Sequence, residues 1–166
     1  PNYRKTFAPD LKKSLPRLFL AEEPTTFWQL AKAGRELADM HLSYENQPHL
    51  ESVTVEGAEK GNFRVQKMSF KSKEDKSELI YNDSITIKNI PPEAHEYIVN
   101  GRTPLEWIID RYRITVDKDS GIENDPNKWC EEQERPRYIL DLILSVITLS
   151  LRTVEIVKAL PKVKLE

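Results

Sequence analysis

The chain has 166 residues, enough for one domain with a buried core, and 39% hydrophobic with 31% charged residues is an ordinary folded composition. Its 25 basic and 27 acidic side chains leave a net charge of −2, which excludes a histone-like, purely electrostatic nucleic-acid binder but allows local basic patches. The single cysteine, Cys130, excludes an internal disulfide and a zinc site of paired cysteines, and it favours a reducing cytoplasm.

The first 24 residues carry four prolines around the apolar run Leu18-Phe19-Leu20. Proline-rich sequence of this kind is typical of an extended connector that packs on a neighbouring surface. We therefore expect residues 1–24 to connect to an upstream domain and residues 25–164 to form the domain itself. The final dipeptide, residues 165–166, resembles the remnant of a joined purification tag, and we expect no function from it.

A helix is predicted next, because apolar residues recur at helical spacing from Thr25 to about Tyr44. Either Thr25 or Thr26 is expected to cap its start. Gly34 lies inside this helix, where glycine costs about 1 kcal/mol relative to alanine. We expect another element to approach closely at Gly34 and to offset that cost.

Between residues 50 and 99 the apolar period falls to two, which predicts several antiparallel strands joined by short polar turns. The pairs expected on one face are Val53/Val55, Phe63/Val65, Leu79/Tyr81 and Ile85/Ile87.

A second helix should begin at Thr103-Pro104-Leu105-Glu106, which is a capping box with proline in the first helical position. Residues 117–134 are polar and rich in turn formers. A long apolar helix is predicted from Arg137 to about Leu160, ended by Pro161 and too often interrupted by polar residues to be a membrane span. The expected fold is α+β, with a mostly antiparallel sheet flanked by an N-terminal helix, a short capped helix and a long C-terminal helix.

Signals of catalysis are poor. Residues 117–128 are not a calcium-binding loop, because the glycine comes one position too early and Lys128 stands in the place of the final glutamate. The three histidines do not have the spacing of a metal site. The five glycines form no phosphate-binding loop. We therefore expect no catalytic residue, no metal and no enzymatic activity in this chain.

The clearest basic stretch is residues 60–76, with six basic and two acidic side chains. Exposed lysines on strands and turns suit phosphate contact, yet lysines on edge strands also protect sheets against aggregation. The residues that we expect to contact phosphates are Lys67, Lys71, Lys73 and Lys128.

A second candidate surface surrounds the capped helix, where arginine, asparagine, lysine and serine recur. These residue types bind base edges and hold phosphates. The expected orientation or base contacts are Arg102, Arg111, Arg113, Lys118, Ser120, Asn124 and Asn127. The alternatives are a surface ion pair of Arg111 beside Trp107 and a simple turn at Asn100-Gly101.

Two stretches resemble a known family. Pro-Arg-Leu-Phe-Leu at 16–20, Phe-Trp at 27–28 and Ala-Gly-Arg-Glu-Leu-Ala-Asp-Met-His-Leu-Ser-Tyr-Glu at 33–45 are similar to the segment beyond the methyltransferase core of type ISP restriction-modification enzymes. The stretch 97–127, with Asn-Gly-Arg-Thr-Pro-Leu-Glu-Trp at 100–107, resembles their C-terminal target-recognition (specificity) domain, as do Pro-Arg-Tyr-Ile at 136–139 and the final helix. Residues 46–90 match least, as expected of a part that varies with the recognised sequence.

In that family one polypeptide joins a nuclease, a helicase-like ATPase, a coupling region, an adenine methyltransferase and the terminal specificity domain. The resemblance implies that this domain recognises a specific duplex DNA sequence and positions it for adenine methylation, or for ATP-driven translocation and cleavage, by the other domains. The resemblance also implies two kinds of partner: double-stranded DNA, and the methyltransferase and coupling domains of the same polypeptide. It implies that the protein acts in the bacterial cytoplasm. S-adenosylmethionine, ATP and Mg²⁺ would belong to the parent enzyme, with no cofactor in this domain.

A rival interpretation is a protein-interaction module that docks the methyltransferase or coupling domain and touches DNA only incidentally. The apolar run at 18–20 and the connector around it support this interpretation. An independent hydrolase or nuclease would need a metal or a nucleophile that the sequence does not display.

Overall fold

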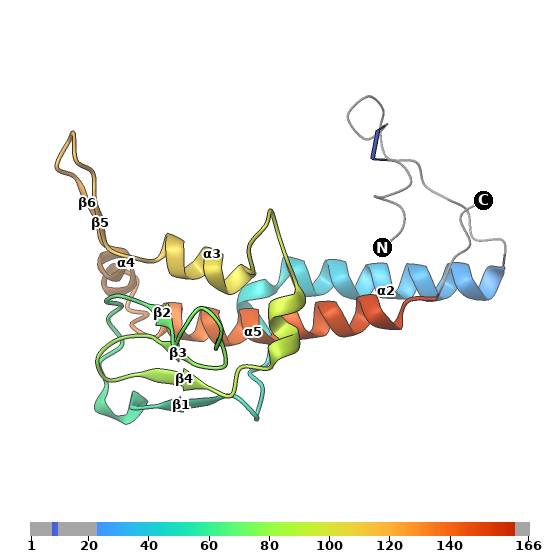
Figure 1. The fold of residues 1–166 in the computed structure, drawn as a ribbon, viewed down its shortest axis with the longest axis horizontal. Coiled ribbons are helices and arrows are strands. Elements are labelled where there is room, and N and C mark those ends of the chain that lie inside the picture. The colour runs from blue at the N-terminus through green and yellow to red at the C-terminus, as the bar shows by residue number, and fades with distance from the viewer. Residues whose placement is uncertain (1–7, 10–22, 162–166) are drawn as a thin grey trace.

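The computed structural model describes residues 8–9 and 23–161. These residues form the predicted α+β fold, in which a four-stranded antiparallel sheet lies beside the helices and a separate two-stranded hairpin projects from the body (Figure 1). The helices are α2 (Pro24–Leu42), α3 (Pro104–Arg111), α4 (Pro126–Glu132) and α5 (Tyr138–Ala159). The strands are β1 (Thr54–Glu56), β2 (Ser69–Phe70), β3 (Leu79–Ile80), β4 (Thr86–Lys88), β5 (Thr115–Val116) and β6 (Glu123–Asn124), and short 3₁₀ turns lie at η1 (Tyr44–Asn46), η2 (Ala58–Lys60) and η3 (Pro92–Glu96).

The larger sheet has the order β1-β4-β3-β2, and each neighbouring pair is antiparallel. The predicted same-face residues Leu79, Tyr81, Ile85 and Ile87 are fully buried, as expected when one face of a sheet covers a core. The strand predicted around Phe63–Val65 does not form. Val65 is buried all the same. The side chain of Asn127 forms the hydrogen bonds to the Val65 backbone that a neighbouring strand would otherwise form.

Helix α5 forms the centre of the domain, and most of its residues are buried. It packs against α2, α3, η1 and η3 and shares one hydrophobic core with the sheet, which confirms the predicted burial of this segment. Its polar residues also have a structural use. The Ser145 hydroxyl donates to the carbonyl of Glu45 (3.0 Å), and the Thr148 hydroxyl donates to that of Pro48 (2.7 Å), so they tie the chain after α2 to α5.

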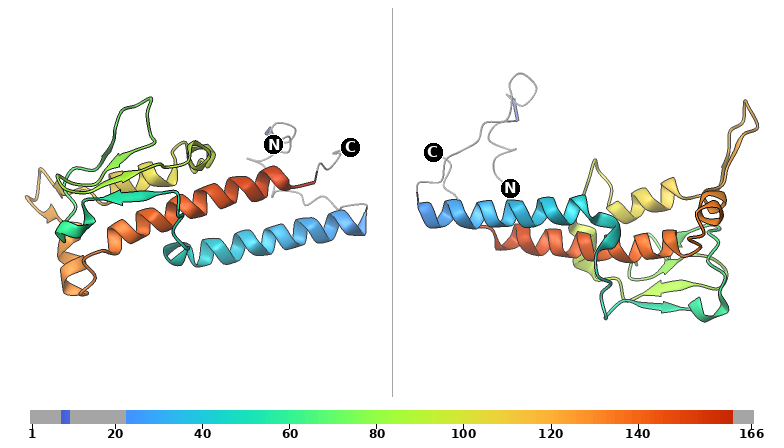
Figure 2. Two further views of the ribbon diagram at one scale, coloured as in Figure 1. Left: turned by 90° about the horizontal axis from the view of Figure 1, so that it is seen from below. Right: turned by 180° about the vertical axis from the view of Figure 1, so that it is seen from behind.

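Helix α2 lies alongside α5 in each view (Figures 1 and 2). Its predicted cap is wrong: the N-cap is Glu23 without a side-chain bond, because Pro24 takes the first helical position and Thr25 and Thr26 are already helical. The close approach expected at Gly34 is also wrong, since a Cβ there would meet nothing within 4 Å.

The start of α3 confirms the predicted capping box. The Thr103 hydroxyl accepts from the Glu106 amide (3.2 Å), and the Glu106 carboxylate accepts from the Thr103 amide (2.8 Å). Before it, Val99 and Arg102 exchange two backbone hydrogen bonds across a turn in which Asn100 and Gly101 have φ of 50° and 83°. Two consecutive positive φ values define a type I′ turn, so Asn100-Gly101 is a turn.

The segment after α3 contains more structure than its polar sequence indicated. Strands β5 and β6 form a hairpin that projects from the body of the domain (Figures 1 and 2). Helix α4 follows, and sequence analysis missed it: Asp125 caps it by accepting from the Asn127 amide, and Pro126 occupies its first turn. Within the described residues, no helix is both long and apolar enough to cross a membrane.

Candidate nucleic-acid interface

Three of the predicted contact residues meet in one groove between β2 and α3. Lys67 precedes β2, Arg102 follows the type I′ turn, and Arg113 follows α3; together they line a hollow of about 450 Å³. We call this hollow, defined by Lys67, Arg102 and Arg113, the basic groove. It unites cations from two regions more than thirty residues apart along the chain.

Acidic side chains of α3 also line the basic groove and orient its cations. One carboxylate, that of Asp110, lies 3.4 Å from the Arg102 guanidinium and 3.2 Å from the Arg113 guanidinium. All three side chains are partly exposed, so these ion pairs add little stability but hold two guanidinium groups side by side. The groove therefore presents two oriented arginines and Lys67, for which no ion pair exists in the described part of the chain.

The other acidic residue of the groove, Glu106, remains ionised to low pH. The ammonium group of Lys76, 2.9 Å away, and the backbone and hydroxyl of Thr103 lower the pKa of Glu106. Because Lys76 is engaged in this pair, it is less available to an external anion than Lys67.

One contact connects Arg102, which lines the basic groove, with Trp107 of α3. The Trp107 ring is anchored by its Nε1–H, which donates to the Val99 carbonyl (2.8 Å). The Arg102 guanidinium lies 5.0 Å from the centre of that ring, within the range of a cation–π contact. Sequence analysis had placed Trp107 beside Arg111 instead.

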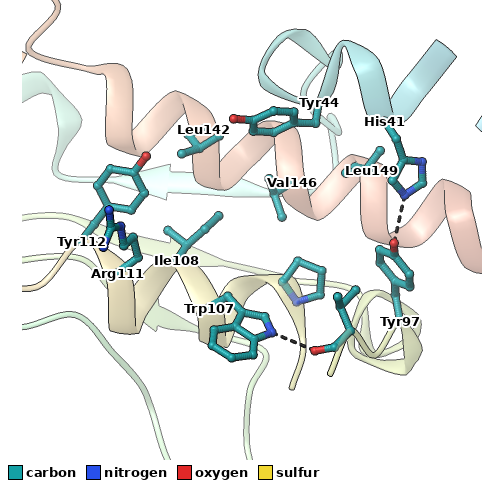
Figure 3. A pocket seen from close by; sticks show the side chains of 12 residues that line it. His41, Tyr44, Tyr97, Trp107, Ile108, Arg111, Tyr112, Leu142, Val146 and Leu149 are labelled. Atoms are coloured by element: carbon teal, nitrogen blue, oxygen red, sulfur yellow. Dashed lines mark hydrogen bonds between the residues drawn. The ribbon is translucent and has the colours of Figure 1, made fainter. Parts of the chain in front are cut away.

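A second hollow, of about 390 Å³, is lined by the face of α3 opposite to the one that lines the basic groove. Figure 3 shows this second hollow from close by. Its floor is formed by Leu142, Val146 and Leu149 of α5. We call it the aromatic pocket, defined by the wall residues His41, Tyr44, Tyr97, Trp107, Arg111 and Tyr112.

Hydrogen bonds hold the rim of the aromatic pocket in one arrangement. The His41 Nδ1–H donates to the Leu37 carbonyl (2.7 Å), and His41 Nε2 is hydrogen-bonded to the Tyr97 hydroxyl (2.9 Å). Sequence analysis did not identify this pocket, because its walls come from three distant segments. The only sequence signal was the four-residue spacing of Trp107 and Arg111, which places both on one face of a helix.

The remaining predicted phosphate contacts lie apart from the groove or are already paired. Lys71 binds Asp75 (3.5 Å) and Glu78 (3.1 Å), and these carboxylates raise its pKa. Lys128 binds Glu123 (3.1 Å). Lys73 is exposed in the loop between β2 and β3, without an ion pair among residues 23–161.

The projecting hairpin carries three predicted residues, Lys118, Ser120 and Asn124, and all are exposed. The Ser120 hydroxyl donates to the Asp117 carboxylate (2.7 Å), which also accepts backbone bonds of the same loop and thereby keeps a lowered pKa. The hairpin tip is thus a preformed loop with Lys118 at its end.

Two predicted residues behave differently from expectation. Asn127 is only 3% exposed, and its amide binds the Val65 backbone, so its assignment to the DNA-facing surface is wrong. Arg111 is exposed and lines the aromatic pocket, and the alternative prediction of a surface ion pair finds no partner in the described residues. Within that same part of the chain, no group of three His, Cys, Asp or Glu side chains could hold a metal ion.

The described residues thus combine an α+β fold, oriented cations beside a capped helix, and a projecting hairpin. A comparison with family models identifies the class of domain as a specificity domain. The model of the Type ISP C-terminal specificity domain matches residues 1–142, and the chain belongs to that family.

Solved structures resemble the whole chain. One is the ATP-dependent Type ISP restriction-modification enzyme LlaBIII bound to DNA, with 46% identity over 99% of this chain and a TM-score of 0.86. Another is a nuclease-deletion mutant of the Type ISP enzyme LlaGI in complex with a DNA substrate mimic, with 47% identity over 99% and a TM-score of 0.86. A DrdV–DNA complex shares 26% identity over 97%, with a TM-score of 0.74.

The chain spans 11%, 15% and 16% of the LlaBIII, LlaGI and DrdV chains, respectively. It therefore corresponds to a small part of each of these proteins. A comparison with curated proteins gave no match.

Proposed function

We propose that this chain recognises a specific duplex DNA sequence on behalf of a longer Type ISP restriction-modification polypeptide and performs no catalysis itself. The observation that carries the proposal is the likeness of nearly the whole chain to two DNA-bound Type ISP enzymes at 46–47% identity. The basic groove supports it, because oriented guanidinium groups are suited to bidentate binding of phosphate oxygens.

The groove residues Lys67, Arg102 and Arg113 are proposed to bind the DNA backbone, and exposed Lys73 extends this surface. Asp110 keeps both arginines extended toward the groove in the free domain. When a phosphate enters, it replaces a partly exposed carboxylate that contributes little by itself, so the exchange costs little free energy.

The projecting hairpin is proposed to enter the major groove, which is wide enough to admit a two-stranded ribbon. Lys118 and Asn124 would bond base edges, because lysine donates to guanine and asparagine forms paired bonds with adenine. Ser120 would contribute its remaining acceptor capacity, since its hydroxyl hydrogen is engaged by Asp117.

The reaction chemistry of the parent enzyme is proposed to reside outside this chain. Adenine methylation, translocation and cleavage, with S-adenosylmethionine, ATP and Mg²⁺, would belong to the other domains of the polypeptide in the bacterial cytoplasm. The methyltransferase and coupling domains would then be the partners on which this domain docks.

A salt titration of duplex binding by the full chain tests the proposal. Removal of one phosphate-binding side chain should reduce the slope of log affinity against log salt by about one unit. We expect this reduction for Lys67→Gln and for Arg113→Gln. Lys158→Gln, which removes an exposed lysine paired with Glu96, is the matched control and should leave the slope unchanged. Binding without salt dependence, or slopes that none of the variants changes, would reject the proposed interface.

A second candidate function, protein docking, is favoured by the composition of the hairpin. Val116 and Ile122 are 59% and 68% exposed, and residues 115–125 contain four acidic side chains and one basic. An acidic hairpin with exposed apolar residues suits a protein surface as well as a DNA groove. The hairpin variant described in the Discussion separates the two functions.

A further inference from the structure

We infer that the aromatic pocket binds a nucleotide, with its base against the rings of the walls and its phosphate on Arg111. The inference deepens the proposed DNA recognition and rests on it for the view that nucleic acid reaches this face of α3. The ligand class is a planar heteroaromatic ring that carries an anionic group. An unstacked nucleotide of the bound DNA and a free mononucleotide share this chemistry.

The size and lining of the aromatic pocket suit a planar ring. Its volume of about 390 Å³ lies in the range of small-molecule sites. Tyr44 and Trp107 lie on opposite sides of it, with Val146 between them (Figure 3). A flat ring that enters here meets aromatic faces and an aliphatic floor, which is the environment in which proteins hold unstacked bases.

Three wall residues, Trp107, His41 and Tyr97, already have hydrogen-bond partners, and this preorganises the pocket. The Trp107 Nε1–H is bound to Val99, and the His41 and Tyr97 side chains are bound to each other (Figure 3). The rings are therefore fixed without a ligand, and binding costs little ordering of side chains. A base would be held mainly by stacking, which tolerates several base types.

The charge at the rim selects an anionic ligand. Arg111 is exposed, lines the pocket and has no ion pair in the described part of the chain. Its guanidinium can bind a phosphate through two parallel hydrogen bonds. An apolar side chain of a protein partner would form no hydrogen bond with this guanidinium. The lining thus favours a nucleotide over an apolar protein side chain.

The pocket lies next to the basic groove. Helix α3 separates the two hollows, and the Arg102 guanidinium on the groove side stacks on the Trp107 ring of the pocket side. An α-helix with its side chains is about 10–12 Å across, so a strand bound at Arg102 passes close to the pocket mouth.

The first arm of the test uses mononucleotides with the full chain. Isothermal titration calorimetry compares deoxyadenosine monophosphate with deoxyadenosine, which lacks the phosphate. We expect the monophosphate to bind at least about 10-fold more tightly, because only the phosphate can form charged hydrogen bonds with Arg111. Arg111→Gln should abolish this preference, and Trp107→Leu should weaken both ligands by about 5- to 150-fold. Arg152→Gln, an exposed arginine of α5 paired with Glu36, is the matched control.

The second arm identifies the source of the nucleotide. Duplexes that carry 2-aminopurine at successive positions are bound to the wild-type chain and to Arg111→Gln. A position whose fluorescence changes with the wild type, and not with Arg111→Gln, shows that the pocket takes an unstacked nucleotide of DNA. Mononucleotide binding without any such position supports the free nucleotide as the ligand.

The proposal is overturned if deoxyadenosine monophosphate does not bind and no 2-aminopurine position responds to Arg111→Gln. The pocket would then be an apolar contact for a protein. This failure is distinct from failure of the proposed function, because duplex binding in the salt titration depends on the basic groove and not on Arg111.

Discussion

A buried asparagine, Asn127, shows how one polar side chain replaces a strand. Its Oδ1 accepts from the Val65 amide (2.7 Å), and its Nδ2 donates to the Val65 carbonyl (3.0 Å), as a neighbouring strand would. The arrangement anchors α4 to the segment between β1 and β2. A buried backbone group without such a partner gives up its hydrogen bonds to water without compensation.

Asn127→Ala is therefore expected to destabilise the fold by about 2–4 kcal/mol, because it leaves two buried backbone groups of Val65 unpaired. Urea denaturation measures the decrease. Asn124→Ala, three residues earlier on the exposed hairpin, is the control and should change the free energy of unfolding by less than about 0.5 kcal/mol. Equal stability of the two variants would show that Asn127 does not hold Val65.

The lowered pKa of Glu106 links the stability of the domain to acid pH. Because the folded pKa lies below the unfolded value near 4.5, the stabilisation is present above pH 4.5 and is lost as the pH falls through the folded pKa. Glu106→Gln can keep the capping bond but not the charge. We expect the wild type to exceed Glu106→Gln in stability at pH 6 and to lose that advantage below pH 4.5.

The measurement is urea denaturation of both proteins at successive pH values. Lys76→Met should reduce the same advantage, since Lys76 is the largest cause of the lowered pKa. A difference between wild type and Glu106→Gln that is constant down to pH 3 would contradict this explanation.

At the scale of elements, the β5–β6 hairpin differs from the rest of the fold. Its residues from Arg113 to Asn124 are almost all exposed, and it projects from the body (Figure 2). A two-stranded hairpin with so little burial contributes little to stability. The length and composition of the hairpin can therefore suit binding without a loss of fold stability.

Replacement of residues 117–122 by Asn-Gly, which suits a two-residue turn, separates base recognition from protein docking. We expect unfolding free energy to change by less than about 0.5 kcal/mol. The binding preference for a wild-type-selected duplex over a scrambled one should fall by about 1–3 kcal/mol for each base contact that the replacement removes. The salt slope should fall by no more than about one unit, because Lys118 is the only cation removed.

Competitive binding with the two duplexes measures this preference. A shortened hairpin that keeps the full preference would show that the hairpin does not contact bases, and protein docking would become the better explanation of Val116 and Ile122.

At the scale of the whole molecule, α5 joins most elements of the described domain, apart from the projecting hairpin, into one core. Its contacts include α2, α3, η1 and η3, and its buried residues share the hydrophobic core with the sheet. Because one helix completes the burial of all these elements, they should unfold together.

Ile143→Ala should lower the free energy of unfolding by about 2–5 kcal/mol, because it opens a cavity at a fully buried position. Val157→Ala, on the same helix but 46% exposed, should cost less than about 0.5 kcal/mol. Urea unfolding followed by circular dichroism and by tryptophan fluorescence should give coincident single transitions. Separate transitions would show that the helical and sheet parts unfold independently.

Local patterns in the sequence predicted the helices α2, α3 and α5 and the strands β1, β3 and β4, but not the helix α4. The capping box at Thr103, the long helix to residue 159 and the buried pairs of β3 and β4 follow from hydrogen bonding and periodicity among residues close in the chain. One wrong prediction, the cap of α2, was local, because Pro24 takes the first helical position. The other wrong predictions depend on tertiary contacts: the strand at 63–65, the close approach at Gly34 and the exposed position of Asn127.

The sequence by itself determined the fold class, the family resemblance and the residue types available for DNA contact. Only the tertiary structure decided which of these residues act together. It brought Lys67, Arg102 and Arg113 into one groove, neutralised Lys71 and Lys128 with nearby carboxylates, and formed the aromatic pocket from three segments. The physical reason is that helix and strand preferences act over a few residues, whereas charge pairing, burial and the shape of a hollow depend on side chains that folding brings together from distant parts of the chain.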